Sequence, residues 1–600
     1  MTVVTEIEKL GSSDGTPQKE VIITKENLQS EHGYVIYNAN IYTVEDDNDS
    51  LPNVVDSLVV LKNIFVDVGS SSLILEKWKD FKHINLNGKT ILPGLIDAHA
   101  HLSNLGESLL SVDLVEVRER IHEYLSIRSS EKDSSEIQWI KGRGWDQTLW
   151  PSKLFPTHND LDSDPILSKF SILLTRIDGH AVWVNKKTLD ILQENNNLPE
   201  EIEGGEICRD KETNELTGIF IDNAIELIDK LVPSPSESTL FTQIKGAISK
   251  MHENGLTGVH DACVELRLIN FFEKIILENP ENFNIRNYAM VESPRNVYCG
   301  DQVKRIDGIG DGRLFVRSVK LVMDGALGSW GAALLEPYSD DPTKQGLLLS
   351  DPSLLTTVIN QWIEKGFQVN THCIGDKANQ IIIDAYEKSF KDYIIKSSPN
   401  NSNELLEEQL KEEIRRLGDK LRFRIEHAQI LTQKDIKRMG ELNIIPSMQP
   451  THATSDMSYA EQRLGPERIK GAYAWRSLIN SGVKRFPLSS DFPIESVNPF
   501  LGFYSAITRK WTNGKSPHGE KGWFESECLT RKETLRGFTI DAAYAGFCED
   551  ILGSIKIGKY ADFIVIDKDI MKIPEQEIPN IKVLSTIFNG NVVYEKNFQN

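Results

Sequence analysis

Short apolar runs separated by turn-forming residues occupy both ends of this 600-residue chain. The runs near the start are GYVIYNANIYTV, SLVVLKNIFVDVG and KHINLNG, and those in the last fifty residues are GSIKIGKYADFIVID and VLSTIFNGNVVYE. Runs rich in Val, Ile, Phe and Tyr between Gly and Asn residues are typical of β-strands. We therefore predict that residues 31–92 and 546–600 meet in one small β domain, preceded by a polar tail over residues 1–30.

The middle of the chain, residues 93–545, alternates strand-like runs with helical patterns. Helical spacing of apolar residues occurs, for example, in SLLTTVINQWIEKG and LTQKDIKRMGEL. The eight strand-like runs cover residues 94–102, 255–262, 284–292, 315–325, 366–375, 421–431, 443–452 and 483–493. Such alternation predicts an α/β fold with a parallel sheet, and eight strands fit a (β/α)8 barrel.

Two stretches are longer than the barrel repeat requires. Residues 103–255 lie mostly between the first two strand-like runs, and a connection of that length far exceeds a crossover helix. This insertion contains GRGWDQTLWP and LLTRIDGHAVWVN, and we predict that it covers the mouth of the barrel. The polar residues 396–420 predict an exposed helical insertion.

Composition and charge narrow the function classes. Hydrophobic residues make up 40% and charged residues 26% of the chain, which is ordinary for a globular protein. The net charge of -21 disfavours nucleic acid or an anionic membrane as a partner. The six cysteines are scattered, and the start of the chain lacks the layout of a signal peptide. We therefore predict a cytoplasmic protein that acts on a small molecule, and a homodimer is compatible with the sequence.

A pair of histidines at the end of the first barrel strand is the first sign of a metal site. His99 and His101 lie two residues apart in DAHAH, so on a strand both side chains project to the same side. Two imidazoles placed in this way can bind one cation. A hydrogen-bonding role in the core is the alternative for the pair alone.

Lys320 lies among apolar residues in VRSVKLVMDG. Burial disfavours the charged form of a lysine, and a neutral amine can combine with carbon dioxide. The resulting carbamate is an anionic oxygen ligand that can bridge two cations. The alternative is a lysine that extends its amine to solvent or pairs with Asp324.

Three further strand ends carry metal-binding residue types. His372 ends FQVNTH, His427 ends RFRIEH, and Asp491 lies in PLSSDFP. The carboxyl ends of barrel strands converge on the active face, so these side chains are predicted to meet His99 and His101. Asp491 can bind a metal through one oxygen and exchange a proton with water through the other. A turn cap is its alternative role.

The ordered motifs GLIDAHAHL, VKLVMDGALGSWGAALLEPY, NTHCIGD, RIEHAQ, SSDFPIE and GSIKIGKYADFIVID resemble the amidohydrolase superfamily. They are most similar to its YtcJ-like, amidohydrolase-3 branch, which includes N-substituted formamide deformylase. The resemblance implies a distorted (β/α)8 TIM barrel with a small β-sandwich built from both chain ends. It implies the metal ligands His99, His101, Lys320, His372, His427 and Asp491, with Lys320 as a carboxylated, bridging residue. Trp330 departs from the pattern, since such proteins often carry arginine there.

The resemblance also implies hydrolysis of a non-peptide carbon–nitrogen bond in a small amide, formamide or cyclic amide. A metal-activated water would attack the carbonyl, and Asp491 would pass the proton to the leaving nitrogen. The cofactor would be one or two divalent ions, with zinc favoured by the ligand types. Two alternatives stay open: hydrolysis of a lactone or phosphoester, or a non-catalytic scaffold that keeps the fold.

The insertion contributes weaker candidates for a substrate-binding wall, which resemble family motifs. They are His180, Arg143, Trp145 and Asp146. A tryptophan-rich insertion can equally pack on itself. His260 and His452 follow the second and seventh barrel strands, and each is either a substrate contact or a structural histidine.

Overall fold

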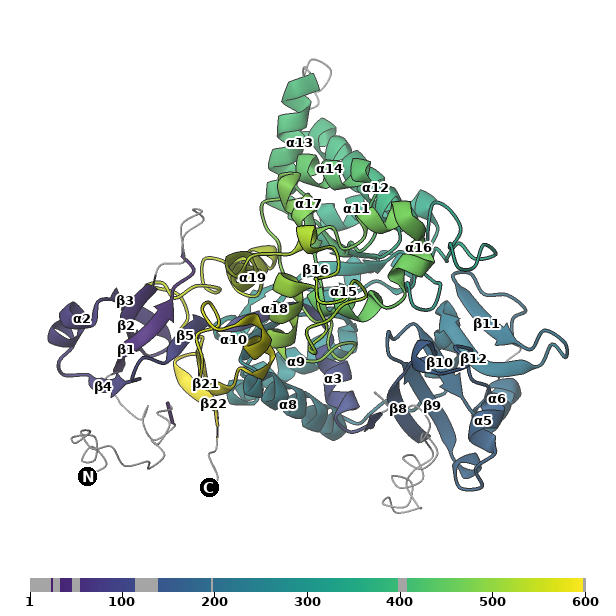
Figure 1. Ribbon diagram of the computed structural model, residues 1–600, viewed down its shortest axis with the longest axis horizontal. Coiled ribbons are helices and arrows are strands. Elements are labelled where there is room, and N and C mark those ends of the chain that lie inside the picture. Colours follow the sequence, from purple (N-terminus) through teal and green to yellow (C-terminus); the bar gives the residue numbers. More distant parts are fainter. Residues whose placement is uncertain are drawn as a thin grey trace.

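The computed structural model describes residues 23–24, 33–45, 54–113, 139–195, 198–397 and 407–596. These residues form three β-sheets: a parallel barrel sheet, a sheet built from both chain ends, and a sheet within the long insertion. Figure 1 shows the barrel between the other two sheets. Most of the predicted N-terminal tail, residues 1–30, lies outside the described residues.

Seven parallel strands form the barrel sheet in the order β19–β18–β17–β16–β14–β13–β6, and the short β15 (Ile306–Gly308) pairs with β16. They are β6 (Leu95–Ala100), β13 (Leu256–Val264), β14 (Arg286–Glu292), β16 (Leu314–Val322), β17 (Gln368–Cys373), β18 (Arg424–His427) and β19 (Ile445–Ser447). Each overlaps one of the predicted runs. The predicted α/β barrel is confirmed.

The eighth predicted strand, residues 483–493, is not a regular strand in the structure. Its central part nevertheless hydrogen-bonds on both sides. Leu488 O accepts from Ala98 N of β6 at 3.2 Å, and Pro487 O accepts from Met448 N, next to β19, at 3.2 Å. Pro487 has no N–H to donate, so a continuous ladder cannot form here. This segment closes the barrel between β19 and β6 and carries Asp491 to its mouth.

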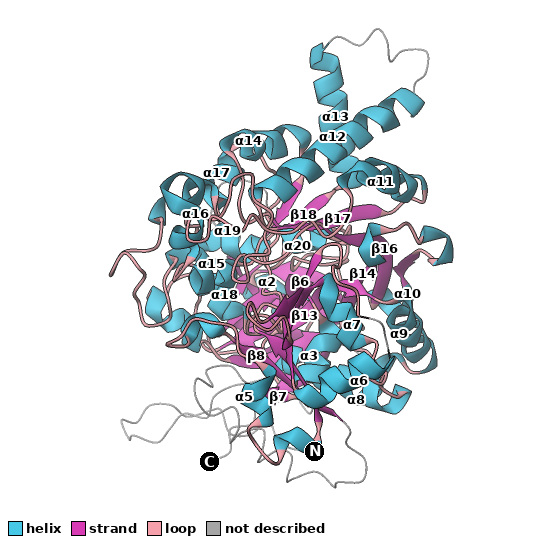
Figure 2. Ribbon diagram, turned by 90° about the vertical axis from the view of Figure 1, so that its right-hand side faces the viewer, coloured by secondary structure: helices cyan, strands magenta, loops and turns pink. Residues whose placement is uncertain are grey.

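Amphipathic helices surround the barrel sheet (Figure 2). Those that follow or connect the strands include α8 (Glu237–Glu253), α9 (Leu266–Glu278), α11 (Leu355–Glu364), α12 (Asp376–Ser397) and α14 (Gln433–Leu442). Their apolar faces pack in one large core with alternate strand residues such as Val319 and Leu321 of β16. The residues between these, such as Ser318 and Lys320, therefore face the barrel interior.

Strands from both ends of the chain share one eight-stranded sheet, in the order β22–β21–β20–β5–β1–β2–β3 with β4 paired to β1. They are β1 (Tyr34–Tyr42), β2 (Val54–Leu61), β3 (Ile64–Gly69), β4 (Lys82–Asn85), β5 (Thr90–Pro93), β20 (Phe563–Ile566), β21 (Val583–Phe588) and β22 (Asn591–Glu595). The two chain ends join where β5 pairs with β20. A helix, α2 (Ser71–Lys77), follows β3, where the sequence pattern predicted only strands. The domain boundaries themselves stay predictions.

The long insertion forms its own six-stranded sheet, in the order β11–β12–β10–β9–β8–β7. Its strands are β7 (Val112–Asp113), β8 (Trp139–Trp145), β9 (Ser171–Arg176), β10 (Ala181–Val184), β11 (Gly205–Arg209) and β12 (Leu216–Asp222). Residues 114–138 lie outside the described residues. Of the second predicted insertion, residues 396–420, the described parts fall on the end of α12 and on α13 (Glu407–Leu421), which project from the barrel in Figure 2, and residues 398–406 lie outside the described residues.

The described ranges contain no helix that is both long enough and apolar enough to cross a bilayer. All six cysteines are free thiols in the structure, including the buried Cys373 beside His372. The predicted cytoplasmic location stays a prediction.

Candidate metal centre

The strand ends bring the predicted ligands to one cavity of about 780 Å3 at the mouth of the barrel. From the predicted set, the cavity is lined by His99, His101, Lys320, His372, His427 and Asp491. His99 lies on β6, Lys320 on β16, His372 on β17 and His427 on β18. The convergence of parallel strands at their carboxyl ends accounts for this meeting of residues far apart in sequence.

His99, His101 and Asp491 form the tightest part of the cluster. Asp491 Oδ1 lies 3.1 Å from His101 Nε2 and 3.6 Å from His99 Nε2. The other ring nitrogen of each histidine is already engaged: His99 Nδ1 contacts Glu426 Oε2, and His101 Nδ1 donates to Ala262 O at 3.0 Å. Because Nδ1 of each ring makes this contact, Nε2 of each ring is directed toward the Asp491 carboxylate. Ligand atoms that converge in this way fit a cation.

His427 and Asp491 reach the cavity through unusual backbone conformations. His427 has φ 72° and Asp491 has φ 62°, in the left-handed region that non-glycine residues rarely adopt. On β18 Glu426 already points to His99 inside the barrel, so regular alternation would turn His427 away. The left-handed turn instead places its ring 4.8 Å from that of His99 and 4.5 Å from that of His372. Backbone strain of this kind is concentrated at functional sites.

The protonation states favour cation binding. Burial lowers the pKa of His99 to about 4 and lowers the pKa values of His372 and His427 well below 6.5. Burial alone would raise the pKa of Asp491, but His101 and His99 outweigh it and hold that pKa well below 3.8. Neutral imidazoles and an ionised carboxylate are the forms that bind metal.

Two polar contacts behind the histidines were not predicted from the sequence. Glu426 orients His99, and Gln449 Oε1 accepts from His427 Nδ1 at 2.8 Å. Burial alone would raise the pKa of Glu426, but Arg424 and His99 lower it to about 2. The available signal was the alternation Arg424–Ile425–Glu426, which places two charged residues on the inner face of a buried strand. Metal-binding histidines commonly have partners of this kind.

We expect Glu426→Gln to weaken metal binding by about 10–100-fold, because the amide is a poorer acceptor for His99 Nδ1–H. Titration of the purified variant with Zn2+ by calorimetry measures this change. The substitution also removes the carboxylate that pairs with buried Arg424, 2.7 Å away, so the melting temperature is measured in parallel. Unchanged zinc affinity in a folded variant would contradict this role of Glu426.

Lys320 lies with its Nζ 3.3 Å from His99 Nε2 and is buried. The alternative partner that the sequence suggested, Asp324, instead accepts backbone N–H groups of Ala333, Ile374 and Gly375 at 2.7–2.9 Å. Lys320 is thus directed at the centre rather than at solvent. Its carboxylation stays a prediction.

The insertion lines the opposite wall of the same cavity with Arg143, Asp146 and His180. His180 Nδ1 lies 2.6 Å from Asp222 Oδ1. Burial works against the charged form of His180, but Asp222 outweighs it and raises the pKa to about 9. A cationic imidazole therefore lies close to the histidine cluster, with its ring 5.4 Å from that of His372.

Trp145 does not line this cavity, unlike its predicted neighbours. It is buried in the core of the insertion, where its Nε1 donates to Leu174 O at 2.9 Å. Regular alternation on β8 would place it on the side of Arg143. Instead Gly144 has φ 104° and the strand register shifts between Arg143 and Trp145, which turns the indole to the other face.

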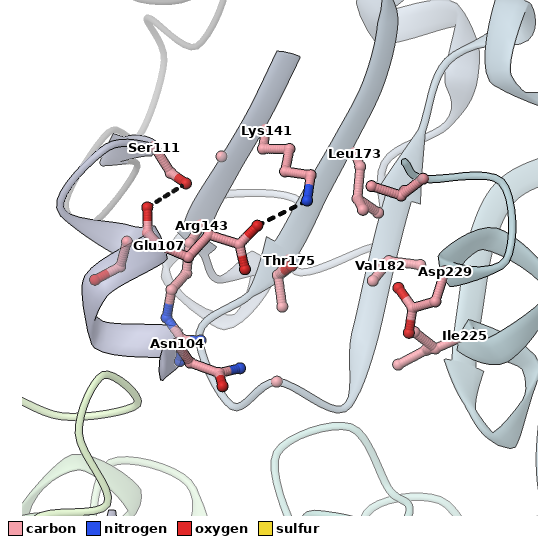
Figure 3. Close-up of a pocket in the computed structure, with 14 residues that line it drawn as sticks. Asn104, Glu107, Ser111, Lys141, Arg143, Leu173, Thr175, Val182, Ile225 and Asp229 are labelled. Atoms are coloured by element: carbon pink, nitrogen blue, oxygen red, sulfur yellow. Dashed lines mark hydrogen bonds and ion pairs between the residues drawn. The ribbon is translucent and has the colours of Figure 1, made fainter. Parts of the chain in front are cut away.

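A smaller cavity of about 240 Å3 adjoins the large one at Asn104, Arg143, Thr175 and Gly179 (Figure 3). Two of its charged groups pair with each other, since Lys141 Nζ lies 2.7 Å from Glu107 Oε1. Arg143 donates to Pro493 O and Ile177 O, each at 3.1 Å. These bonds hold Arg143 where the two cavities meet.

The two remaining candidate histidines, His260 and His452, lie in different environments. His260 is buried inside the barrel, with Nδ1 2.8 Å from Arg424 Nη1, so its environment is that of a structural histidine. His452 lines the large cavity. Among the residues that the structure describes, two groups of side chains have ligand atoms close enough to share a metal: His99, His101 and Asp491, and His427, His452 and Asp491.

Histidines and an aspartate at the carboxyl ends of the strands of a (β/α)8 barrel are typical of metal-dependent hydrolases. The model of the amidohydrolase family (Amidohydro_3) matches residues 82–594. The chain belongs to this amidohydrolase family.

Known relatives span nearly the whole chain. YtcJ of Bacillus subtilis is 30% identical over 93% of this chain and 98% of its own length. LONG AFTER FAR-RED 3 of Arabidopsis thaliana is 30% identical over 93% and 91%, and N-substituted formamide deformylase of Arthrobacter pascens is 25% identical over 94% and 98%. A solved metal-dependent hydrolase from Pyrococcus furiosus is similar with a TM-score of 0.66 and 26% identity, over 90% of this chain and all of that one.

Proposed function

We propose that the protein is a metal-dependent hydrolase of a non-peptide carbon–nitrogen bond in a small amide, formamide or cyclic amide. The observation that carries the proposal is the convergence of His99 Nε2, His101 Nε2 and the Asp491 carboxylate at the mouth of the barrel. The likeness to the Pyrococcus metal-dependent hydrolase supports the metal, and the likeness to the formamide deformylase supports the bond type. The cavity volume is in the usual range for small-molecule sites.

The residues present fit a divalent cation, and zinc is the metal that imidazole and carboxylate ligands favour here. His99, His101, His372, His427 and Asp491 would hold it, with Lys320 as a further ligand if carboxylated. When bound, the metal supplies Lewis acidity, which lowers the pKa of water and polarises a carbonyl oxygen.

The protein side chains divide the remaining tasks. Asp491 is ionised and faces the histidines, so it can accept a proton from water and return it to the leaving nitrogen. His180, held by Asp222, can donate to the substrate from the insertion side of the cavity. The insertion, through residues such as Arg143, forms part of the wall of the cavity in which the substrate would lie.

Removal and return of metal test the proposed function. We expect the purified chain to contain zinc, to lose turnover on dialysis against a chelator, and to regain it with added Zn2+. The substrates to compare are N-substituted formamides, N-acyl amines and cyclic amides, with a lactone and a phosphoester as the alternative class. Full turnover without metal would contradict the proposal, and a folded, metal-free protein without turnover would support the scaffold alternative.

A further inference from the structure

Hydrogen-bond acceptors line one part of the large cavity beside the predicted metal ligands. We call this part the acceptor site, and it consists of Gln429, Ser455, Asp456 and Glu495. Gln429 lies just beyond the end of β18, Ser455 and Asp456 end α15 (Pro450–Asp456), and Glu495 lies shortly after Asp491. Gln429 Nε2 donates to Asp456 Oδ2 at 3.2 Å, and Ser455 Oγ donates to Glu495 Oε1 at 2.6 Å. These bonds hold the four side chains together.

The neighbours of Gln429 define which end of its amide lacks a partner. Asp456 accepts from the hydroxyl groups of Tyr459 and Tyr473 as well as from Gln429, so the Gln429 group that faces it must be the NH2. The amide oxygen of Gln429 then has no hydrogen-bond partner among the described residues, although the residue is only 4% exposed. Buried polar atoms normally have partners, so this oxygen at the cavity wall indicates a donor supplied by a ligand.

The two carboxylates of the acceptor site also lack a cationic partner. On the insertion side of the cavity, Asp146 and Asp178 both pair with Arg176. In contrast, neither Asp456 nor Glu495 forms an ion pair with a lysine, arginine or histidine in the part of the chain that the structure describes. Burial raises the pKa of both carboxyl groups. A positive charge brought into the cavity would therefore stabilise their ionised forms.

The acceptor site lies near the residues that act on the leaving nitrogen. His452 Nε2 lies 3.7 Å from Asp491 Oδ2, and His452 also acts electrostatically on Asp456 and Glu495. Asp491 itself acts electrostatically on Glu495. Because Asp491 is proposed to return a proton to the leaving nitrogen, that nitrogen must lie next to it. The substituent of this nitrogen is then the part of the substrate that reaches the acceptor site.

We propose that the acceptor site binds a protonated amino group on the substituent of the leaving nitrogen. The substrate is then a monoacylated diamine, with the reacting amide at one end and an ammonium group at the other. This assignment rests on the proposed function for the reacting bond. An ammonium group has three N–H donors, which suit the oxygen of Gln429 and the second oxygen of Glu495. A neutral alkyl group would leave these acceptors unpaired, which costs binding free energy.

Two matched ligands that cannot be hydrolysed test the inference without turnover. The mono-methanesulfonamide of diaminobutane ends in an ammonium group, and the methanesulfonamide of pentylamine ends in a methyl group at the same position. Each is titrated by calorimetry into the full-length, zinc-loaded protein at neutral pH. We expect the ammonium ligand to bind about 10–100-fold more tightly, which is the range for hydrogen bonds to a charged group.

Variants of one carboxylate assign this preference to the acceptor site. Glu495→Gln should remove most of the preference, and Glu495→Asp, which keeps the charge, should retain part of it. The matched control is Glu467→Gln, at an exposed glutamate outside the cavity, and it should keep the full preference.

Equal binding of the two ligands by the unaltered protein overturns the inference, and so does a preference that Glu495→Gln leaves unchanged. If Glu495→Gln fails to fold, the preference of the unaltered protein decides. The formamides of the same two amines then test turnover. A protein that prefers the ammonium ligand but hydrolyses neither formamide contradicts the proposed function and leaves the ammonium site in place.

Discussion

Asp491→Asn should lower kcat by about 10^3-fold while the barrel still folds, because the amide cannot accept the proton that general base catalysis requires. Asn keeps one carbonyl oxygen, and His99 and His101 are unchanged, so at least one metal ion should remain bound. Steady-state kinetics on the best amide substrate, together with zinc counts on the same preparation, measure both effects.

Asp340→Asn is the matched control for this variant. Asp340 also belongs to an ion pair, with Arg463, but it does not line the cavity. The control should keep normal turnover. If Asp491→Asn with full metal content turned over substrate at a near-normal rate, Asp491 would have no part in proton transfer.

Lys320→Ala should lose metal, with affinity reduced at least as much as the ~10–100-fold typical for an outer partner of a ligand. The reason is that a carboxylated Lys320 would supply an anionic oxygen to the centre, where its amine already lies 3.3 Å from His99 Nε2. Alanine leaves space at that position, so added formate or acetate should restore part of the metal binding and of the turnover.

Lys320→Met distinguishes the loss of the amine from the loss of side-chain volume. Methionine fills the space of the lysine stem without an amine, so this variant should lose metal and should not respond to added carboxylates. Should Lys320→Ala bind as many zinc ions as the parent chain, no carbamate is needed in this centre.

The sequence predicted the strand ends well because each is an apolar run that stops at a histidine or an aspartate. Four separate segments carried such signals, and a fifth carried Lys320 within its apolar run. The parallel arrangement of a barrel leaves only one place for them to meet. His99 and His372 are examples: the residue type, the end of the run and the alternation along the strand all agreed.

Other parts of the site depend on backbone geometry that residue patterns do not record. Arg143 and Trp145 are two residues apart on β8, so regular alternation would place them on the same face. The positive φ of Gly144 instead places them on opposite faces. Glu426 and His427 are adjacent on β18, so regular alternation would place them on opposite faces. The left-handed conformation of His427 instead brings both side chains toward His99. That His452 lines the cavity, whereas His260 is buried inside the barrel, also depends on the folded chain.

The pairing of β5 with β20 has a consequence for biosynthesis. Thr90 and Ile566 lie opposite each other in the sheet although nearly the whole barrel separates them along the chain. While the ribosome makes the protein, the free edge of β5 must wait for almost all of the remaining polypeptide before its neighbour emerges. Such an unpaired edge is prone to aggregation, so we expect nascent chains that stop before Phe563 to need chaperones that full-length chains do not.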